Sequence, residues 1–210
     1  MNEEQLQELL LQSLEHEKGG VLVYETAVKC AVNEDLKEEW EEYLEQTRTH
    51  VATLEDVCSV MGIDAEQASP GCDIIRHLGI ALVEAMEKAR ATGDAAAAQL
   101  VACECVVLAE TKDHLDWELL GQCAKKLTGD QAQALKEACE EVEEEEDEHL
   151  YHTKGWCREL WLESLGLKAV LPPPEERKHV TTAIGAARAE QASIKSRRGS
   201  GSKTRQRVKA

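Results

Sequence analysis

The sequence predicts an all-α protein, a four-helix bundle of two antiparallel helical hairpins with a crossover helix. Ala, Leu, Glu and Lys dominate the 210 residues, Phe is absent, and the Val, Ile, Thr and Tyr runs that favour strands are scarce. Apolar residues recur every three or four positions over long segments, as they do on one face of a helix. Turn residues group these segments into two hairpins with a long connection between them. This order is one of the known arrangements of a four-helix bundle.

The first hairpin is marked by capping residues. We expect its first helix over about residues 3–31 and its second from the Asn33 cap to Met61. An Asn side chain accepts hydrogen bonds from the free amides at a helix start, and the two acids that follow it suit the positive end of the helix dipole. Gly62 can adopt the left-handed conformation that ends a helix.

The second half of the chain contains the crossover helix and the second hairpin. Gly93 and Gly129, each followed by Asp, mark the turns there. The proline run that starts at Pro172 cannot continue a helix. Three further helices are therefore expected, over about residues 72–91, 95–127 and 131–165.

Charge divides the chain into an acidic body and a basic tail. The net charge is −17, but residues 188–210 carry +7, which leaves −24 on residues 1–187. We expect the bundle over residues 1–166 and a Pro-containing linker, with room for a short helix, over 167–187. The tail should be disordered because it has little apolar surface. It could bind nucleic acid by releasing counterions or lie on the acidic body, and the sequence leaves both open.

The chain has the features of a cytoplasmic protein. No run of 18 apolar residues predicts a membrane span, and the acidic start MNEEQLQELL is unlike a secretory signal. The eight cysteines include no Cys-x-x-Cys pair, and Cys103 and Cys105 would point apart on one helix. We interpret most of them as buried thiols in a reducing compartment. The alternative is a redox pair that involves Cys72.

Four of the predicted helices carry an ionisable side chain in the middle of an apolar face. Burying such a group without a partner costs several kcal/mol, so a shared partner is expected, and a metal ion is the simplest one. The side chains, in chain order, are Glu17, His50, Glu110 and the Glu-x-x-His pair of Glu146 and His149.

Hairpin register places these side chains at matching levels. Residues equally distant from the turn of an antiparallel hairpin lie level. Glu17 lies 16 residues before position 33, and His50 lies 16 after position 34. In the second hairpin Glu110 lies 19 residues before the turn glycine, while Glu146 and His149 lie 17 and 20 after it. Each set is level to within about 3 Å at helical rise.

The residue types suit a carboxylate-bridged site for iron or manganese. Such sites take one Glu from each of two helices and a Glu-x-x-His pair from each of the other two. Carboxylate oxygens can bridge two cations, and imidazole suits both metals. Here Glu17 and Glu110 would be the single ligands, and Glu146 and His149 one pair. The second helix offers His50 alone, because a threonine stands three residues before it and the neighbouring Glu45 and Gln46 face away on ideal helix geometry.

Several neighbours are alternative ligands. His114 is a candidate on the third long helix, and His152 and Asp113 are further candidates. Glu143 would replace the core-facing glutamate if the last helix were rotated. The acidic run over residues 140–148 is also typical of a solvated face. The site could therefore be dinuclear, mononuclear or degenerate.

Residues 14–165 resemble the ferritin-like, YciF-type bacterial stress proteins. The stretches that carry the resemblance are LKEEWEEYLEQTRTHVATLEDVCSVMG, CDIIRHLGIALVEAMEKA, and the Leu-Ala-Glu-Thr-Lys-Asp-His segment ahead of AKKLTG. The resemblance implies a four-helix bundle, a homodimer and a carboxylate metal site. His149 departs from it, because such sequences often carry Lys there.

Two functions follow from the sequence. The first is a ferritin-like protein that binds iron or manganese in an oxidative or metal stress response. The alternative is a non-catalytic interaction bundle with a degenerate metal site, which recruits partners or nucleic acid through the tail 188–210. Bound metal after purification distinguishes them.

Overall fold

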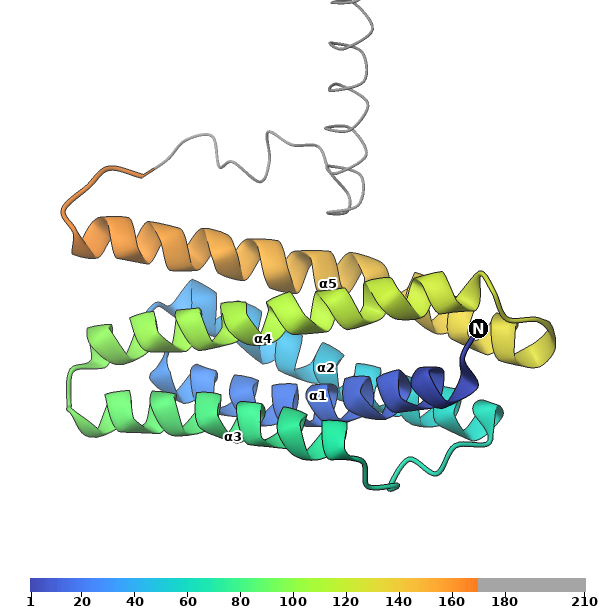
Figure 1. Cartoon of the computed structure of the whole chain (residues 1–210). Coiled ribbons are helices and arrows are strands. Elements are labelled where there is room, and N and C mark those ends of the chain that lie inside the picture. Colours follow the sequence, from blue (N-terminus) through green and yellow to red (C-terminus); the bar gives the residue numbers. More distant parts are fainter. Residues whose placement is uncertain (170–210) are drawn as a thin grey trace, which may run out of the picture. The chain divides into compact units, whose positions relative to one another are not determined.

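The computed structural model describes residues 1–169, and this part of the chain folds into helices without any strand. Its order matches the expected one (Figure 1). The expected tail and most of the linker lie outside the described residues. The helices are α1 (Glu3–Cys30), α2 (Glu34–Met61), α3 (Pro70–Ala91), α4 (Ala95–Ala124) and α5 (Gly129–Ser164).

The helix ends follow the capping residues. The Asn33 side chain accepts from the backbone N–H of Leu36, and Gly62 ends α2 at a φ of 72°, as predicted. Helix α3 starts two residues earlier than expected because Ser69 caps it and accepts from the Cys72 N–H at 3.0 Å. Pro70 then occupies a first-turn position where no N–H is needed.

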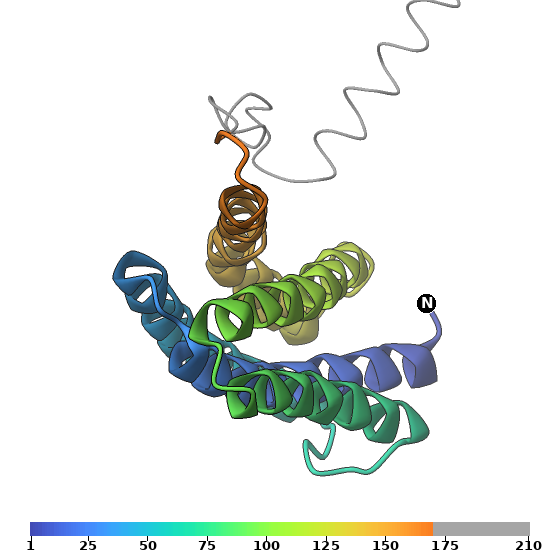
Figure 2. The ribbon, with the colours of Figure 1, turned by 90° about the vertical axis from the view of Figure 1, so that its left-hand side faces the viewer.

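The four long helices pack around one another, and α3 lies beside α1 and α4. Helix α1 also contacts α2 and α4, and α5 contacts α2 and α4 (Figure 2). Two glycines let α1 approach its neighbours closely. A Cβ added at Gly20 would lie 3.2 Å from Cγ2 of Thr47, and one added at Gly79 would lie 3.6 Å from Cα of Gly19. The chain therefore brings α1 near α2 and α3 within one turn of Glu17.

The apolar core is divided into two clusters along the bundle. One contains Tyr24, Trp40 and Met86, and the other contains Leu54 and Leu135. Full burial of a large apolar side chain stabilises a fold by roughly 1.5–3 kcal/mol. A layer of buried polar residues separates the clusters along α2 and α5. Apolar burial in the two clusters thus offsets the free-energy cost of burying the polar layer between them.

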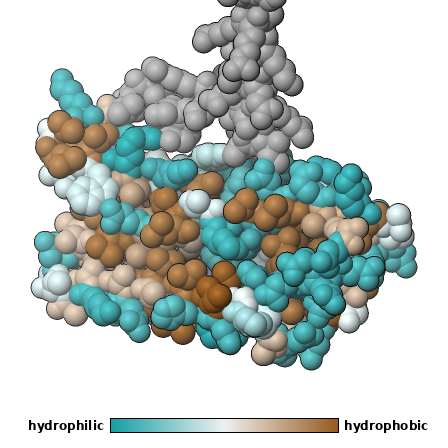
Figure 3. Space-filling model, viewed as in Figure 1, coloured by the Kyte–Doolittle hydropathy of each residue, from teal (hydrophilic) through white to brown (hydrophobic). Residues whose placement is uncertain are grey.

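The surface mixes hydrophilic and apolar areas (Figure 3). Exposed apolar side chains include Ile74 and Leu78 on α3 and Leu108 and Leu115 on α4. No helix within residues 1–169 is long and apolar enough to cross a membrane. All eight cysteines lie within the described residues as free thiols, and five of them, including Cys72, are buried.

Candidate metal centre

Glu17 and His50 meet across α1 and α2, as the hairpin register predicts. Nδ1 of His50 lies 3.5 Å from Oε1 of Glu17 and 3.2 Å from Oε1 of Glu146 on α5. The three side chains are 0–2% exposed. Their ligand atoms all lie within 4.8 Å of one another, so this group could hold a metal ion. Three helices therefore contribute to the first group.

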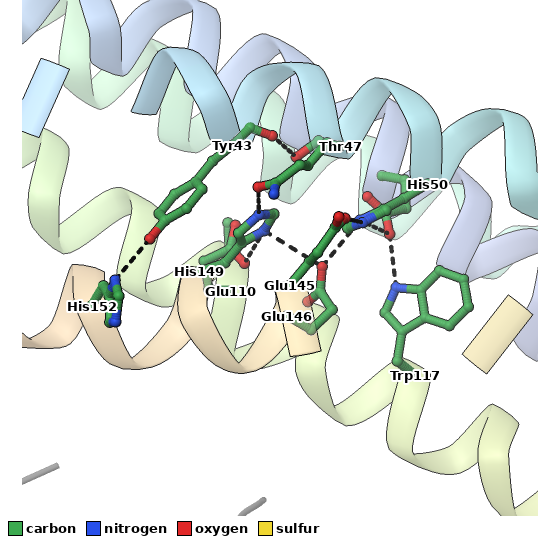
Figure 4. Close-up of polar contacts among 12 residues, drawn as sticks. Tyr43, Thr47, His50, Glu110, Trp117, Glu145, Glu146, His149 and His152 are labelled. Atoms are coloured by element: carbon green, nitrogen blue, oxygen red, sulfur yellow. Dashed lines mark hydrogen bonds and ion pairs between the residues drawn. The ribbon is translucent and has the colours of Figure 1, made fainter. Parts of the chain in front are cut away.

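A second group lies beside the first and shares Glu146 with it. Nδ1 of His149 lies 3.6 Å from Oε2 of Glu110 and 3.6 Å from Oε1 of Glu146. This group also fits within 4.8 Å and is buried. The rings of His50 and His149 are stacked with their centroids 5.7 Å apart (Figure 4). Glu146 is thus placed between two imidazoles, where a carboxylate can bridge two cations.

Six inward oxygens and nitrogens of the two groups have no hydrogen-bond partner. Nδ1 of each imidazole lies 3.2–3.6 Å from carboxylate oxygens without the geometry of a hydrogen bond. A buried polar atom without a partner costs about 1–3 kcal/mol, so a natural fold retains few of them. The unpartnered atoms here are Oε2 of Glu17, Nδ1 of His50, Oε2 of Glu110, both carboxylate oxygens of Glu146 and Nδ1 of His149.

The outward nitrogens of both imidazoles have acceptors. Nε2 of His50 lies 2.8 Å from Oε2 of Glu145, and Nε2 of His149 lies 2.9 Å from Oε1 of Gln46. An imidazole that donates Nε2–H to such an acceptor keeps the lone pair of Nδ1 free for a cation. Metal-binding histidines are usually oriented in this way. Both rings therefore have the orientation that inward ligation by Nδ1 requires.

Aromatic side chains close the site. The indole N–H of Trp117 donates to Oε1 of Glu17 at 2.8 Å. The ring of Tyr43 lies 4.3 Å from that of His149, and Tyr24 lies edge-on to the same imidazole at 5.9 Å. Buried aromatic rings therefore pack directly against Glu17 and His149.

Charge in the cluster favours bound protons when no cation is present. Burial alone would lower the pKa of His50, but its contacts with Glu146 and Glu17 outweigh burial and raise it to about 11. Burial alone would also lower the pKa of His149, but its contacts with Glu110 and Glu146 outweigh burial and raise it. The pKa of Glu146 is raised to about 7, mainly by burial. His50 lowers this pKa, and the negative charges of Glu110 and Glu17 raise it further. A cation would displace these protons.

An acidic pocket opens over His50 between α2 and α5. Its volume is about 370 Å³. Glu145 stands at this opening, about one third exposed, with its carboxylate on the imidazole. His50 therefore belongs both to the buried cluster and to the lining of a pocket rich in carboxylates. The lining residues are Glu42, Glu45, Gln46, Thr49, His50, Thr53, Glu141, Val142 and Glu145.

Five of the six predicted ligands come together, and His114 does not. Nε2 of His114 lies 2.8 Å from Oδ1 of Asp147, outside both groups. His114 is only half-buried at the edge of the inward face of α4, whereas Asp113, three residues after Glu110, is buried. His152 is exposed and contacts Glu39. The acidic run has a solvated side, which includes the rival Glu143.

Sequence reasoning missed the acceptors of both imidazoles. Gln46 was expected to face away, yet its side chain reaches His149. Glu145 was hidden in the acidic run, although it stands next to a core-facing glutamate. The sequence did contain one signal for this contact. Gln46 lies four residues before His50, so the two side chains are neighbours on one side of the helix.

Comparisons with protein-family models, curated proteins and solved structures found no match for this chain.

Proposed function

We propose that this protein binds iron or manganese in the buried cluster of Glu17, His50, Glu110, Glu146 and His149. The observation that carries the proposal is the set of buried inward oxygens and nitrogens without hydrogen-bond partners. If these atoms were paired with one another, direct hydrogen bonds would compensate for the cost of removing them from water. Here the imidazole nitrogens lie 3.2–3.6 Å from the carboxylate oxygens, and the ligand atoms of each group lie within 4.8 Å of one another, which leaves an ion as their common partner.

The ligand types support these two metals. The donors are carboxylate oxygens and imidazole nitrogens, and none of the eight cysteines belongs to either group. Thiolates would favour softer ions, whereas mixed oxygen and nitrogen ligands suit iron and manganese. Ligands from four long helices also match the design of bundle metalloproteins, so we propose a ferritin-like arrangement of the fold.

The proposed role is redox chemistry or metal handling in an oxidative or metal stress response. Iron or manganese bound here would supply one-electron chemistry towards oxygen or peroxide. The protein's own residues orient the ligands, exclude water through Tyr43 and Trp117, and release protons when a cation enters. The free cysteines are compatible with the reducing cytoplasm, which is the compartment that we propose.

The test is the metal content of full-length protein after expression and purification without chelators. We expect iron or manganese in the wild-type chain and its loss in Glu146→Gln, which alters the ligand shared by both groups. Glu143→Gln is the matched control, because it removes a charge from an exposed position one turn away on α5. Far-UV circular dichroism should show equal helicity in all three.

A wild-type protein that takes up neither metal, even when it is reconstituted, would contradict the proposal. It would favour the alternative of a non-catalytic interaction bundle. Equal loss of metal in Glu143→Gln and Glu146→Gln would also contradict the assignment, because the exposed position should not matter.

A further inference from the structure

Helix α4 buries a second carboxylate beside the cluster, and no contact accounts for it. Asp113 is 5% exposed, and its Oδ1 has no hydrogen-bond partner. The next aspartate on the same helix, Asp116, is equally buried but pairs with Lys112. Because an ionised carboxylate buried without a partner is costly, Asp113 in its ionised form would need a partner that no hydrogen bond or ion pair of its Oδ1 provides.

The contacts of its neighbours on α4 locate Asp113 between the two groups. Glu110, three residues before it, contacts His149 of the second group. Trp117, four residues after it, donates to Glu17 of the first group. Residues at this spacing lie on one face of a helix. Asp113 therefore faces the cluster at a level between its two halves.

Helix α2 lacks the carboxylate that would pair with His50. Thr47 stands three residues before His50, is buried, and donates its hydroxyl to the backbone oxygen of Tyr43. Its methyl group also lies where a side chain at Gly20 would clash. The close approach of α1 and α2 therefore fills the place where a longer acidic side chain would stand.

The charges of these side chains indicate how many cations the cluster would hold. Counting Asp113, which neither of the two groups includes, with Glu17, Glu110 and Glu146 gives four carboxylates, together with two imidazoles that are neutral when bound to a cation. One divalent cation would leave two negative charges buried, whereas two divalent cations balance all four. Each cation would then have a histidine and share Glu146 with the other.

We propose that the cluster holds two divalent cations and that Asp113 is the ligand that completes it, in place of a carboxylate from α2. This inference rests on the proposed function. It adds a ligand and a stoichiometry to a site that could otherwise hold a single ion.

The test is an anaerobic titration of the full-length, metal-free protein with Mn²⁺, in which isothermal titration calorimetry measures the number of ions bound. We expect two ions per wild-type chain and one per chain of Asp113→Asn. Asp116→Asn is the matched control and should still bind two, because that aspartate is directed to Lys112. Circular dichroism checks that the variants are folded.

Electron paramagnetic resonance of the Mn²⁺-loaded wild-type protein gives a second readout that needs no variant. Two ions that share Glu146 should give the broadened signal of a coupled pair, and Asp113→Asn should give the six-line signal of an isolated ion. Two ions in Asp113→Asn, or a single uncoupled ion in the wild type, would overturn this inference and leave the proposed function standing. No bound ion in the wild type would overturn the proposed function itself.

Discussion

The substitution Glu146→Gln should stabilise the metal-free protein at alkaline pH. Glu146 is 2% exposed, and neither of its oxygens has a hydrogen-bond partner. Its pKa rises from 4.5 to about 7 in the fold, and each pKa unit corresponds to about 1.4 kcal/mol. The ionised carboxylate therefore costs the metal-free protein roughly 3 kcal/mol, a cost that the neutral amide avoids.

The sign of the pH dependence follows from the raised pKa. The folded state binds this proton more tightly than the unfolded chain does. The stability that protonated Glu146 contributes is fully present below pH 4.5 and is lost as the pH rises through about 7. The advantage of Glu146→Gln should therefore be roughly 3 kcal/mol at pH 8 and below about 1 kcal/mol at pH 5.

Thermal unfolding followed by circular dichroism measures this difference. With chelator at pH 8, Tm of Glu146→Gln should exceed the wild-type Tm by roughly 6–12 °C for a chain of this size. Added Mn²⁺ at about 100 times its Kd should stabilise the wild type by about 2.7 kcal/mol and should not affect the variant. A metal-free variant less stable than wild type at pH 8, or an equal response to Mn²⁺, would refute the reasoning.

Other consequences concern the surroundings of the ligands. Gln46→Leu should weaken Mn²⁺ binding about 10–100-fold, because it removes the acceptor that orients His149, and Gln46→Glu should retain it. Trp117→Phe should abolish the change in tryptophan fluorescence on metal binding, since this indole contacts Glu17 directly. The affinity for Mn²⁺ should fall as the pH drops, because the ion must displace the imidazole protons, and should fall more steeply below about pH 7, where Glu146 also holds a proton. Calorimetry, fluorescence titration and a pH series measure the three effects.

Each of these consequences has a contradicting result. Equal Mn²⁺ affinity of Gln46→Leu and wild type would show that the amide does not orient the ring. A fluorescence response that survives in Trp117→Phe would place the ion elsewhere. Affinity that does not change between pH 8 and pH 6 would mean that binding releases no protons.

The levels of the ligands could be predicted from the sequence because short turns fix the register of a hairpin. Glu17 and His50 meet as that register requires. The rotation of a helix about its axis is set by packing against all its neighbours, which one sequence pattern does not determine. His114 was therefore predicted as a ligand, although the face of α4 that turns inward carries Asp113.

Side-chain reach was a second source of error. On ideal geometry Gln46 points away from the core, but its long side chain bends to the imidazole of His149. The acceptor of His50 was equally hard to predict, because Glu145 belongs to a run of acids that all look alike in sequence. The local spacing between α2 and α5 determines which side chains reach the two imidazoles.

The most direct test of the central claim is anomalous diffraction from crystals of the full-length protein loaded with Mn²⁺. We predict anomalous peaks inside the bundle at about 2.0–2.3 Å from Nδ1 of His50 and Nδ1 of His149, with a carboxylate oxygen of Glu146 shared between them. Peaks confined to the surface, with direct hydrogen bonds between these imidazoles and carboxylates inside, would contradict the claim that the cluster is a metal site.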